Sequence, residues 1–249
     1  MFRRHTNFIT LQWIMANNFF KFKQFRIAQD KCAMKVGTDG VLLGAWVNLS
    51  EKKHILDIGT GTGLIALMMA QRSNAIIDAL EIETEAYQQA LENARNSPWS
   101  QQINLINLPL QDFCTSKNYD LIITNPPFFN KSLENPDVKK TNARHDRKLK
   151  QDDILIACHK YLSDNGKLAL ILPVNEGNKF TVKAMEYEFS CNRITYVKPT
   201  PGKEVKRLLM EFSRKKKPLT EDYLTIENNK RHDFTEKYIE LTKEFYLYF

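Results

Sequence analysis

The chain has 249 residues, of which 43% are hydrophobic and 26% charged, so its length and composition suit one large packed domain. Its longest uninterrupted apolar run, Leu64–Ala70, is far too short to cross a membrane. Thirty-six basic residues against 29 acidic ones give a net charge of +7, which favours a polyanionic partner without establishing one.

The four cysteines argue against a metal site and against disulfides. They are far apart, with no Cys-x-x-Cys pair and no Cys/His ligand spacing: Cys32, Cys114, Cys158 and Cys191. We therefore expect reduced, mostly buried thiols in a cytoplasmic protein.

Residues 1–14 differ from the rest of the chain. Arg3 and Arg4 precede the segment Phe8–Ile14, a pattern that faintly resembles a secretory signal, but polar residues interrupt the segment and no cleavage site follows it. The alternative is an upstream extension before a native start at Met15. We expect a leader over 1–14 and a single domain over 15–249.

Next come a predicted strand and a predicted helix. Phe20–Phe25 alternates aromatic with other residues, which predicts a strand with its lysines on one face. That face is either a nucleic-acid contact or, by default, a solvated surface. In Met34–Trp46, two glycines bracket a turn, Thr38 or Asp39 can cap a helix, and Val41–Trp46 supplies its apolar face.

A glycine-rich loop follows the buried strand His54–Ile58. The loop, Gly59–Gly63, leads into the apolar helix Leu64–Arg72, so a ligand can approach backbone amides at the start of that helix. The segment also satisfies the dinucleotide pattern G-x-G-x-x-A, which keeps a nicotinamide enzyme open. Asp57, two residues before the first glycine, instead favours S-adenosylmethionine, whose cationic amino group suits a nearby carboxylate.

Two further acidic residues follow predicted strands. Glu81 ends the strand Ala75–Ile82, where a carboxylate can bind both hydroxyls of a ribose. The alternative, an acidic residue opening the next helix, fits Glu83 and Glu85 better. Asp112 follows the strand Ile103–Leu110 and can accept from an adenine amino group, with Phe113 packing on the ring; a plain polar loop residue is almost as well supported.

The strand Tyr119–Thr124 ends at Asn125-Pro126-Pro127-Phe128. The prolines hold the chain extended and fix Asn125 at the carboxyl end of the strand, the edge at which open α/β sheets bind ligands. The Asn125 side-chain oxygen and the Pro126 carbonyl can both accept from one exocyclic amino group, and Phe128 offers a ring for stacking. The alternative is a strand that ends in a Pro-rich turn. Helix and strand signals alternate from His54 onward, which predicts a parallel sheet with helices on both faces.

The second half of the chain is strongly basic in two places. Residues 131–150 predict a long surface loop beside the active edge, in which His145 is a solvent or substrate contact rather than a general base. A helix at Gln151–Leu162, a strand at Lys167–Leu172 and a helix around Phe180–Tyr187 follow. Ile194–Val197 and Val205–Phe212 predict paired strands. The basic tail that follows, with Lys215–Lys217, is expected to share one polyanion surface with the loop, and a final amphipathic helix includes Tyr238, Leu241 and Phe245.

Taken together, the motifs resemble class I S-adenosylmethionine-dependent methyltransferases. They are, in order, Asp57-x-Gly59-x-Gly61-x-Gly63, Glu81, Asp112 and Asn125-Pro126-Pro127-Phe128. Further segments are similar to the bacterial tRNA1(Val) (adenine(37)-N6)-methyltransferase family over about residues 17–249: Phe22–Phe25, Met34–Trp46, Asn125–Leu133, Ala143–His145, Val197–Lys203 and Leu241–Leu247. Phe128 departs from the Tyr of many amino-methyltransferases, but both rings stack.

This resemblance implies an α/β, Rossmann-like fold, with a mostly parallel seven-stranded sheet, an antiparallel last strand and helices on both faces. The implied cofactor, S-adenosylmethionine, would be bound by Thr38, Asp39, Asp57, Gly59, Gly61, Gly63, Glu81 and Asp112. The target base would be held by Asn125, Pro126 and Phe128. RNA would be bound by Lys139, Lys140, Arg144, His145, Arg147, Lys203 and Lys206.

The implied reaction is methyl transfer to N6 of adenine 37 in a valine tRNA, by a cytoplasmic and monomeric enzyme without a metal or a membrane. The alternatives are a protein glutamine N5-methyltransferase, which would share Asn-Pro-Pro without needing the basic segments, and another RNA amino-methyltransferase. A nicotinamide oxidoreductase is the third alternative.

Overall fold

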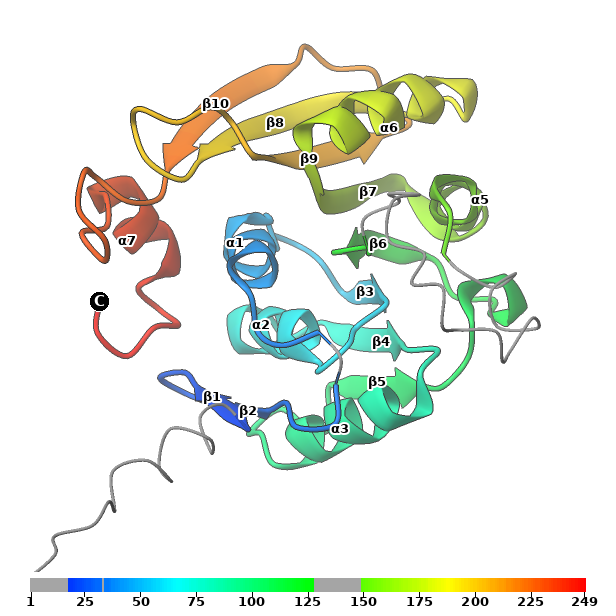
Figure 1. The fold of residues 1–249 in the computed structure, drawn as a ribbon. Helices are drawn as coiled ribbons and strands as arrows, with labels where there is room; N and C mark the ends of the chain where they lie inside the picture. The colour runs from blue at the N-terminus through cyan, green and yellow to red at the C-terminus, as the bar shows by residue number, and fades with distance from the viewer. Residues whose placement is uncertain (1–17, 33, 128–148) are drawn as a thin grey trace, which may run out of the picture.

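The computed structural model describes residues 18–32, 34–127 and 149–249. One mixed sheet dominates it, with strand order β10-β8-β9-β7-β6-β3-β4-β5 (Figure 1). The strands are β3 (His54–Ile58), β4 (Ile76–Leu80), β5 (Ile103–Ile106), β6 (Tyr119–Thr124), β7 (Leu162–Pro173), β8 (Ser190–Lys198), β9 (Arg207–Ser213) and β10 (Thr220–Thr225).

The direction of the strands confirms most of the predicted topology. Strands β5, β4, β3, β6 and β7 are parallel, and β9 runs antiparallel to both β7 and β8. The prediction of seven strands is one short, because β10 adds to the edge and pairs parallel to β8. An edge strand is not buried on both faces, so it does not need the continuous apolar run that marks a central parallel strand. Thr220–Thr225 is rich in polar residues and mostly exposed, and no strand was predicted there.

Helices cover both faces of the sheet, as predicted (Figure 1). They are α1 (Thr38–Trp46), α2 (Leu64–Arg72), α3 (Thr84–Arg95), α5 (Gln151–Tyr161), α6 (Val174–Glu186) and α7 (Glu236–Thr242). Alternate side chains of each strand point to opposite faces. In β6, Leu121 and Ile123 join the core beneath α1, α2 and α7, whereas Ile122 joins the core beneath α5 and α6.

The predicted strand over Phe20–Phe25 is wrong. The chain instead forms a hairpin of β1 (Phe19–Lys21) and β2 (Arg26–Ala28), with Phe22 and Phe25 in its turn. The Phe22 amide donates to the Phe25 carbonyl, and their rings stack with centroids 4.6 Å apart inside the core. Lys23 Nζ donates to the carbonyls of Lys243 and Phe249 and so ties the hairpin to that distant segment.

Helix α1 also begins differently from the prediction. Gly37 is its N-cap residue and provides no side-chain cap, so neither Thr38 nor Asp39 caps it. Helix α2 has the predicted bounds, whereas α6 begins at Val174, directly after β7 and earlier than predicted. Over the three described ranges, no helix is both long and apolar enough to cross a membrane, and no cluster of potential metal ligands occurs. Two of the four free cysteines, Cys32 and Cys158, are buried.

Candidate functional site at the carboxyl edge of the sheet

The candidate site lies where the strand order reverses. From β3 the chain proceeds to β4 and β5 on one side and later returns to place β6 and β7 on the other. Such a reversal leaves a crevice beyond the carboxyl ends of the two neighbouring strands. The Thr124 hydroxyl at the end of β6 donates to the Ile58 carbonyl at the end of β3, over 2.8 Å. The glycine loop after β3 and Asn125 after β6 therefore leave the sheet side by side.

Backbone conformation explains the glycines of this loop. Gly59, Gly61 and Gly63 have φ angles of 71°, 58° and 81°, in the left-handed region that other residues rarely adopt. The surroundings of the first and third glycine differ. A Cβ on Gly59 would meet no described atom within 4 Å, whereas one on Gly63 would lie 3.4 Å from Ala90 Cβ in α3. Gly59 therefore opens onto free space, and Gly63 allows α3 to pack closely.

The Asp57 carboxylate is completely buried beneath the loop. Its Oδ2 accepts a 2.6 Å hydrogen bond from the Thr60 hydroxyl, and its Oδ1 accepts none from any described residue. Burial raises the pKa of this carboxyl to about 7; the Thr60 hydroxyl opposes the rise and the Glu81 carboxylate adds to it. Asp57 thus holds the loop from below, with one buried oxygen lacking a hydrogen bond.

Glu81 follows β4 and is nearly buried. Its two oxygens accept from the amides of Gly61, over 2.8 Å, and Glu83, over 2.9 Å. Burial raises its pKa, although these backbone amides act in the opposite direction. The carboxylate therefore links the end of β4 to the glycine loop, and it does not cap α3 through its side chain.

Asp112 ends the short 3-10 helix Leu110–Asp112 and is exposed. The expectation that Phe113 packs on a ligand ring is not met, because Phe113 is buried in the α5–α6 core. Its ring lies edge-on to Tyr161, and the Tyr161 hydroxyl donates to its carbonyl. Strand β5 ends at Ile106, earlier than predicted, and the following turn directs Phe113 inward.

Asn125 is half-buried, Pro126 is buried and Pro127 is exposed. A Cβ built on Gly40 of α1 would lie 4.0 Å from Asn125 Nδ2 and 3.0 Å from Leu64 Cδ2, so the bare glycine lets α1 approach this edge. The sequence analysis did not predict that α1 packs close to Asn125 at Gly40. Phe128 lies outside the described residues.

The start of α1 faces the start of β9. Arg207 Nε donates to Asp39 Oδ2 over 2.7 Å, and Arg207 Nη1 donates to the Lys206 carbonyl over 3.0 Å. Arg207 was not predicted as a site residue, because 168 positions separate it from Asp39 and no local motif marks it. Lys203 and Lys206 are exposed near it, in the connection between β8 and β9.

The predicted RNA-binding surface is only partly described. Lys139, Lys140, Arg144, His145 and Arg147 lie outside the described residues.

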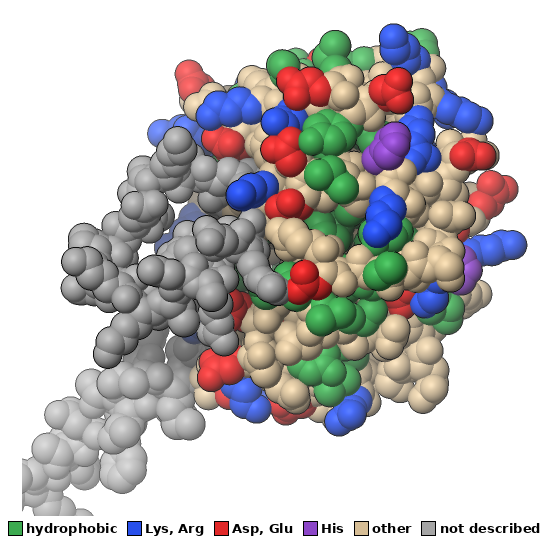
Figure 2. Space-filling model, turned by 90° about the vertical axis from the view of Figure 1, so that its right-hand side faces the viewer, with side chains coloured by type: hydrophobic (Ala, Val, Ile, Leu, Met, Phe, Trp, Pro, Cys, Tyr) green, Lys and Arg blue, Asp and Glu red, His purple; other side chains and the backbone are tan. Residues whose placement is uncertain are grey.

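The basic tail does not belong with the active edge. Arg207 begins β9 opposite Pro173 at the carboxyl end of β7, whereas Phe212 pairs with Leu168 near the other end. Lys215–Lys217, which follow β9, therefore lie at the opposite edge of the sheet. Arg214 there donates to the carbonyls of Leu162 and His159 at the end of α5. On the molecular side that Figure 2 shows, basic side chains are interspersed with acidic and hydrophobic ones.

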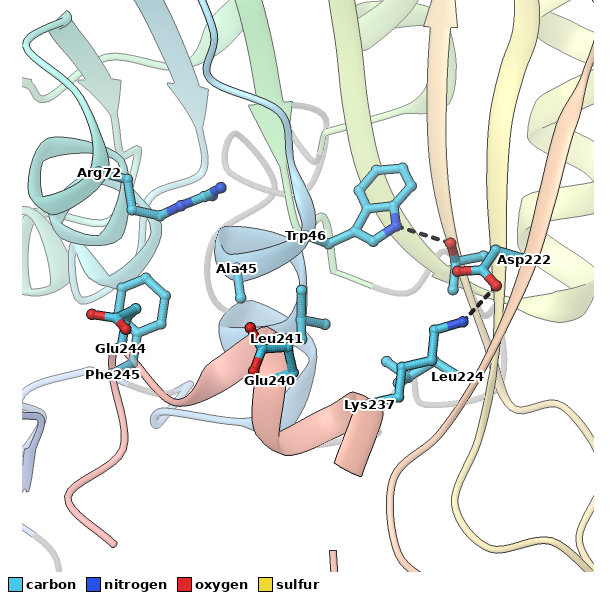
Figure 3. A pocket seen from close by; sticks show the side chains of 11 residues that line it. Ala45, Trp46, Arg72, Asp222, Leu224, Lys237, Glu240, Leu241, Glu244 and Phe245 are labelled. Atoms are coloured by element: carbon cyan, nitrogen blue, oxygen red, sulfur yellow. Dashed lines mark hydrogen bonds and ion pairs between the residues drawn. The ribbon is translucent and has the colours of Figure 1, made fainter. Parts of the chain in front are cut away.

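A cavity of about 500 Å³ lies away from the carboxyl edge. It is enclosed by the end of α1, by α7 and by strands β8 and β10 (Figure 3). Trp46 Nε1 donates to Thr195 Oγ1 over 2.9 Å in its wall, and Lys237 pairs with Asp222. Trp46 is the last of the nine residues of α1 and Thr38 the first, so about 12 Å of helix separates this cavity from the carboxyl edge. It is not part of the candidate site.

Comparison with known proteins identifies the chain's relatives. The family model described as the methyltransferase small domain matches residues 35–195. A tRNA1(Val) (adenine(37)-N6)-methyltransferase of Trichodesmium erythraeum is 51% identical, over 94% of this chain and 99% of that protein. The protein of the same name from Flavobacterium psychrophilum is 48% identical, over 92% and 99% respectively.

Solved structures agree in fold. A predicted O-methyltransferase from Agrobacterium tumefaciens aligns with a TM-score of 0.64 at 20% identity, over 83% of this chain and 96% of its own. A glycopeptide N-methyltransferase in complex with S-adenosylmethionine aligns with a TM-score of 0.54 at 11% identity, over 71% and 95%. By its sequence relatives and its fold, the chain belongs to the methyltransferase small domain family and, within it, to the tRNA1(Val) (adenine(37)-N6)-methyltransferases.

Proposed function

We propose that this protein transfers a methyl group from S-adenosylmethionine to N6 of adenine 37 in the anticodon loop of a valine tRNA. The observation that carries the proposal is the position of Asn125 at the reversal of strand order, beside the glycine loop and tied to it through Thr124 and Ile58. Close identity to relatives of that name over nearly their whole length supports the substrate. The catalytic domain in this proposal comprises residues 15–249.

The residues of the loop fit the cofactor. Free space in front of Gly59 leaves a cradle that a Cβ would fill, so the ligand can press against the backbone. Asp57 has a buried oxygen without a hydrogen bond, which suits a positively charged group above the loop. Glu81 offers its remaining lone pairs to ribose hydroxyls while it holds the Gly61 amide, and Asp112 is exposed for an adenine amino group. In this proposal Thr38 and Asp39 lie near the methionine end of the cofactor.

S-adenosylmethionine supplies an electrophilic methyl group on its sulfonium. The amino nitrogen of adenine is a poor nucleophile, because its lone pair is delocalised into the ring. The Asn125 side-chain oxygen and the Pro126 carbonyl accept its two hydrogens, draw them out of the ring plane and return electron density to the nitrogen. Since an alkylated amino nitrogen is acidic, no strong base is needed before transfer. Alignment and electrostatics supply the rate enhancement.

The base must leave its stack to reach Asn125, which costs a few kcal/mol and less in a loop than in a duplex. Phe128 stacks on it in this proposal. The basic residues of the 131–150 segment, together with Lys203 and Lys206, bind the RNA phosphates. The protein acts as a monomer in the cytoplasm, where its tRNA substrate is found.

The test compares substrates under labelled S-adenosylmethionine. A valine tRNA transcript should accept label, and nucleoside mass spectrometry should find N6-methyladenosine in it. A matched transcript with guanine at position 37 should accept none. Equal labelling of both transcripts would contradict the assignment to this adenine, and labelling of a protein glutamine instead would favour the N5-methyltransferase alternative.

A further inference from the structure

An aromatic pair lies at the β10 edge of the sheet, on the face against which α6 packs. Tyr196 of β8 and Tyr223 of β10 are register partners, and their rings stack with centroids 5.0 Å apart. Tyr196 packs against the α5–α6 core, whereas Tyr223 is 60% exposed. Among the described strands β10 is the last on this side, so no further strand of the sheet covers the outer side of Tyr223 (Figure 1). The Tyr223 ring therefore presents a flat apolar surface at the edge.

Hydrogen bonds hold this pair in place. The Tyr196 hydroxyl donates to Glu221 Oε1 over 2.6 Å, which fixes the ring on which Tyr223 stacks. The Tyr223 amide donates to Asp222 Oδ1, and the Tyr223 carbonyl accepts from Lys237 Nζ over 2.7 Å. Because these backbone groups are occupied, a strand of another chain cannot readily pair with β10 at this residue. The edge thus offers a partner the exposed ring rather than the backbone.

The charge beside the pair favours a polyanion. Lys198 follows Tyr196 by two residues and lies on the same face of β8. The connection from β8 to β9 then carries the exposed Lys203 and Lys206, with Glu204 between them. From Lys198 to Lys206 the chain therefore places three cations and one carboxylate beyond the aromatic pair.

The pair and these lysines lie toward the same edge of the sheet as Asn125. Strand β9 begins at the carboxyl end of β7 and runs antiparallel to β8, so β8 and β10 both end at that edge. Tyr196 and Tyr223 lie two residues before the ends of their strands. Four strand spacings of about 4.8 Å separate β10 from β6, so Tyr223 lies roughly 19 Å from Asn125. The ring is too far away to touch the target base but can reach another nucleotide of the same RNA.

We propose that Tyr223 is a stacking platform for a second, unpaired base of the tRNA, with Tyr196 behind it and Lys198 beside it for an adjoining phosphate. The proposal rests on the proposed function and adds a docking surface to it. Single-stranded nucleic acid binds where aromatic rings lie next to cations, because every base has a face that stacks and every linkage carries a negative charge. The base extends the Tyr196–Tyr223 stack outward, and Glu221 is the positioning residue of Tyr196.

The first test measures affinity for the anticodon stem-loop RNA of valine tRNA by fluorescence anisotropy. Tyr223→Ala should weaken binding about tenfold or more, as expected for the loss of one stacking partner. Tyr223→Phe should bind like the wild type, because the ring is kept. Tyr248→Ala removes a tyrosine that is 93% exposed and outside this pair, so it is the matched control and should change nothing. Wild-type affinity in Tyr223→Ala would overturn the proposal.

Two further variants separate stacking from a general effect on the edge strand. Tyr223→Leu keeps apolar bulk without a ring and should weaken RNA binding as Tyr223→Ala does, while thermal denaturation shows that the fold is retained. Lys198→Gln should lower the slope of log affinity against log salt by about 0.7, the value for one phosphate of a single strand, whereas Tyr223→Ala should keep the wild-type slope. Wild-type affinity in Tyr223→Leu would overturn the proposal, because the ring would then not stack on a base.

Stem-loops with a single abasic nucleotide identify the stacked base. At one unpaired position other than adenine 37, removal of the base should weaken binding to the wild type and have no further effect on binding to Tyr223→Ala. Absence of such coupling at every unpaired position would overturn the proposal.

Methylation kinetics distinguish this proposal from the proposed function. Tyr223→Ala should raise the KM for tRNA and change kcat little, because the ring lies far from the target base. Failure of the proposed function would appear as wild-type protein that does not methylate adenine 37. Failure of the platform alone would leave that activity intact and give Tyr223→Ala the wild-type KM.

Discussion

Gly59→Ala and Gly63→Ala form a matched pair that tests whether the cofactor lies against the first glycine. Both residues have left-handed backbone, with φ angles of 71° and 81°, so an alanine at either position is strained by about 1–2 kcal/mol. For a chain of this length that strain lowers the melting temperature by roughly 2–8 °C. The new methyl groups differ in their surroundings. The one at Gly59 enters open space in the crevice, whereas the one at Gly63 meets Ala90 Cβ at 3.4 Å.

We therefore expect the two variants to lose similar stability but to differ in cofactor affinity. Gly59→Ala should weaken S-adenosylmethionine binding at least tenfold, about 1.4 kcal/mol, because the methyl group occupies the ligand's place against the backbone. Gly63→Ala should change that affinity less than about threefold. Calorimetry gives both dissociation constants, and thermal denaturation gives the stabilities. Equal losses of affinity in the two variants would refute the placement of the cofactor in front of Gly59.

Three further predictions concern charged groups. Burial raises the pKa of the Asp57 carboxyl from 3.8 to about 7. The folded protein therefore binds a proton here more tightly than the unfolded chain does. The resulting stability is fully present below pH 3.8 and is lost as the pH rises through about 7. The melting temperature of Asp57→Asn minus that of the wild type should therefore increase from pH 5 to pH 8. A difference that stays constant over this range would contradict the raised pKa of Asp57. Glu81→Gln should weaken S-adenosylmethionine binding about ten- to hundredfold in calorimetry, because the charged acceptor for the Gly61 amide is lost. An unchanged dissociation constant would count against a role of Glu81 in cofactor binding. Replacing Lys215, Lys216 and Lys217 together by Gln should leave the salt dependence of tRNA binding unchanged, because they lie at the edge opposite Asn125, and a flatter slope would place RNA there.

The sheet and its active edge could be predicted from the sequence because parallel strands end on one side. The apolar runs around Ile55, Ile77 and Ile122 marked buried strands, and the residues after each run had to meet at the same edge. Asp57, Glu81 and Asn125 were found in this way, although the sequence did not show that Asp57 lies beneath the loop.

Features that depend on contacts between distant segments could not be predicted. The turn at Phe22–Phe25 breaks the alternation of a strand, because both rings enter a core completed by the chain's last residues. The Asp39–Arg207 pair joins two segments without a local signal. The position of Lys215–Lys217 could have been predicted. A strand antiparallel to its neighbours ends at the edge of the sheet opposite their carboxyl ends, so the residues that follow it lie at that opposite edge. The prediction that this tail and the 131–150 segment share one surface relied instead on their similar charge.

The rate of methyl transfer by Asn125→Ala tests the central claim most directly. The assay follows N6-methyladenosine in valine tRNA by nucleoside mass spectrometry, at saturating S-adenosylmethionine, with the cofactor's dissociation constant measured in parallel. Loss of the one side-chain acceptor for the amino group should slow the reaction about a hundredfold or more, while cofactor affinity stays at the wild-type value. A near-native rate in this variant would contradict the proposed role of the Asn125-Pro126-Pro127 edge.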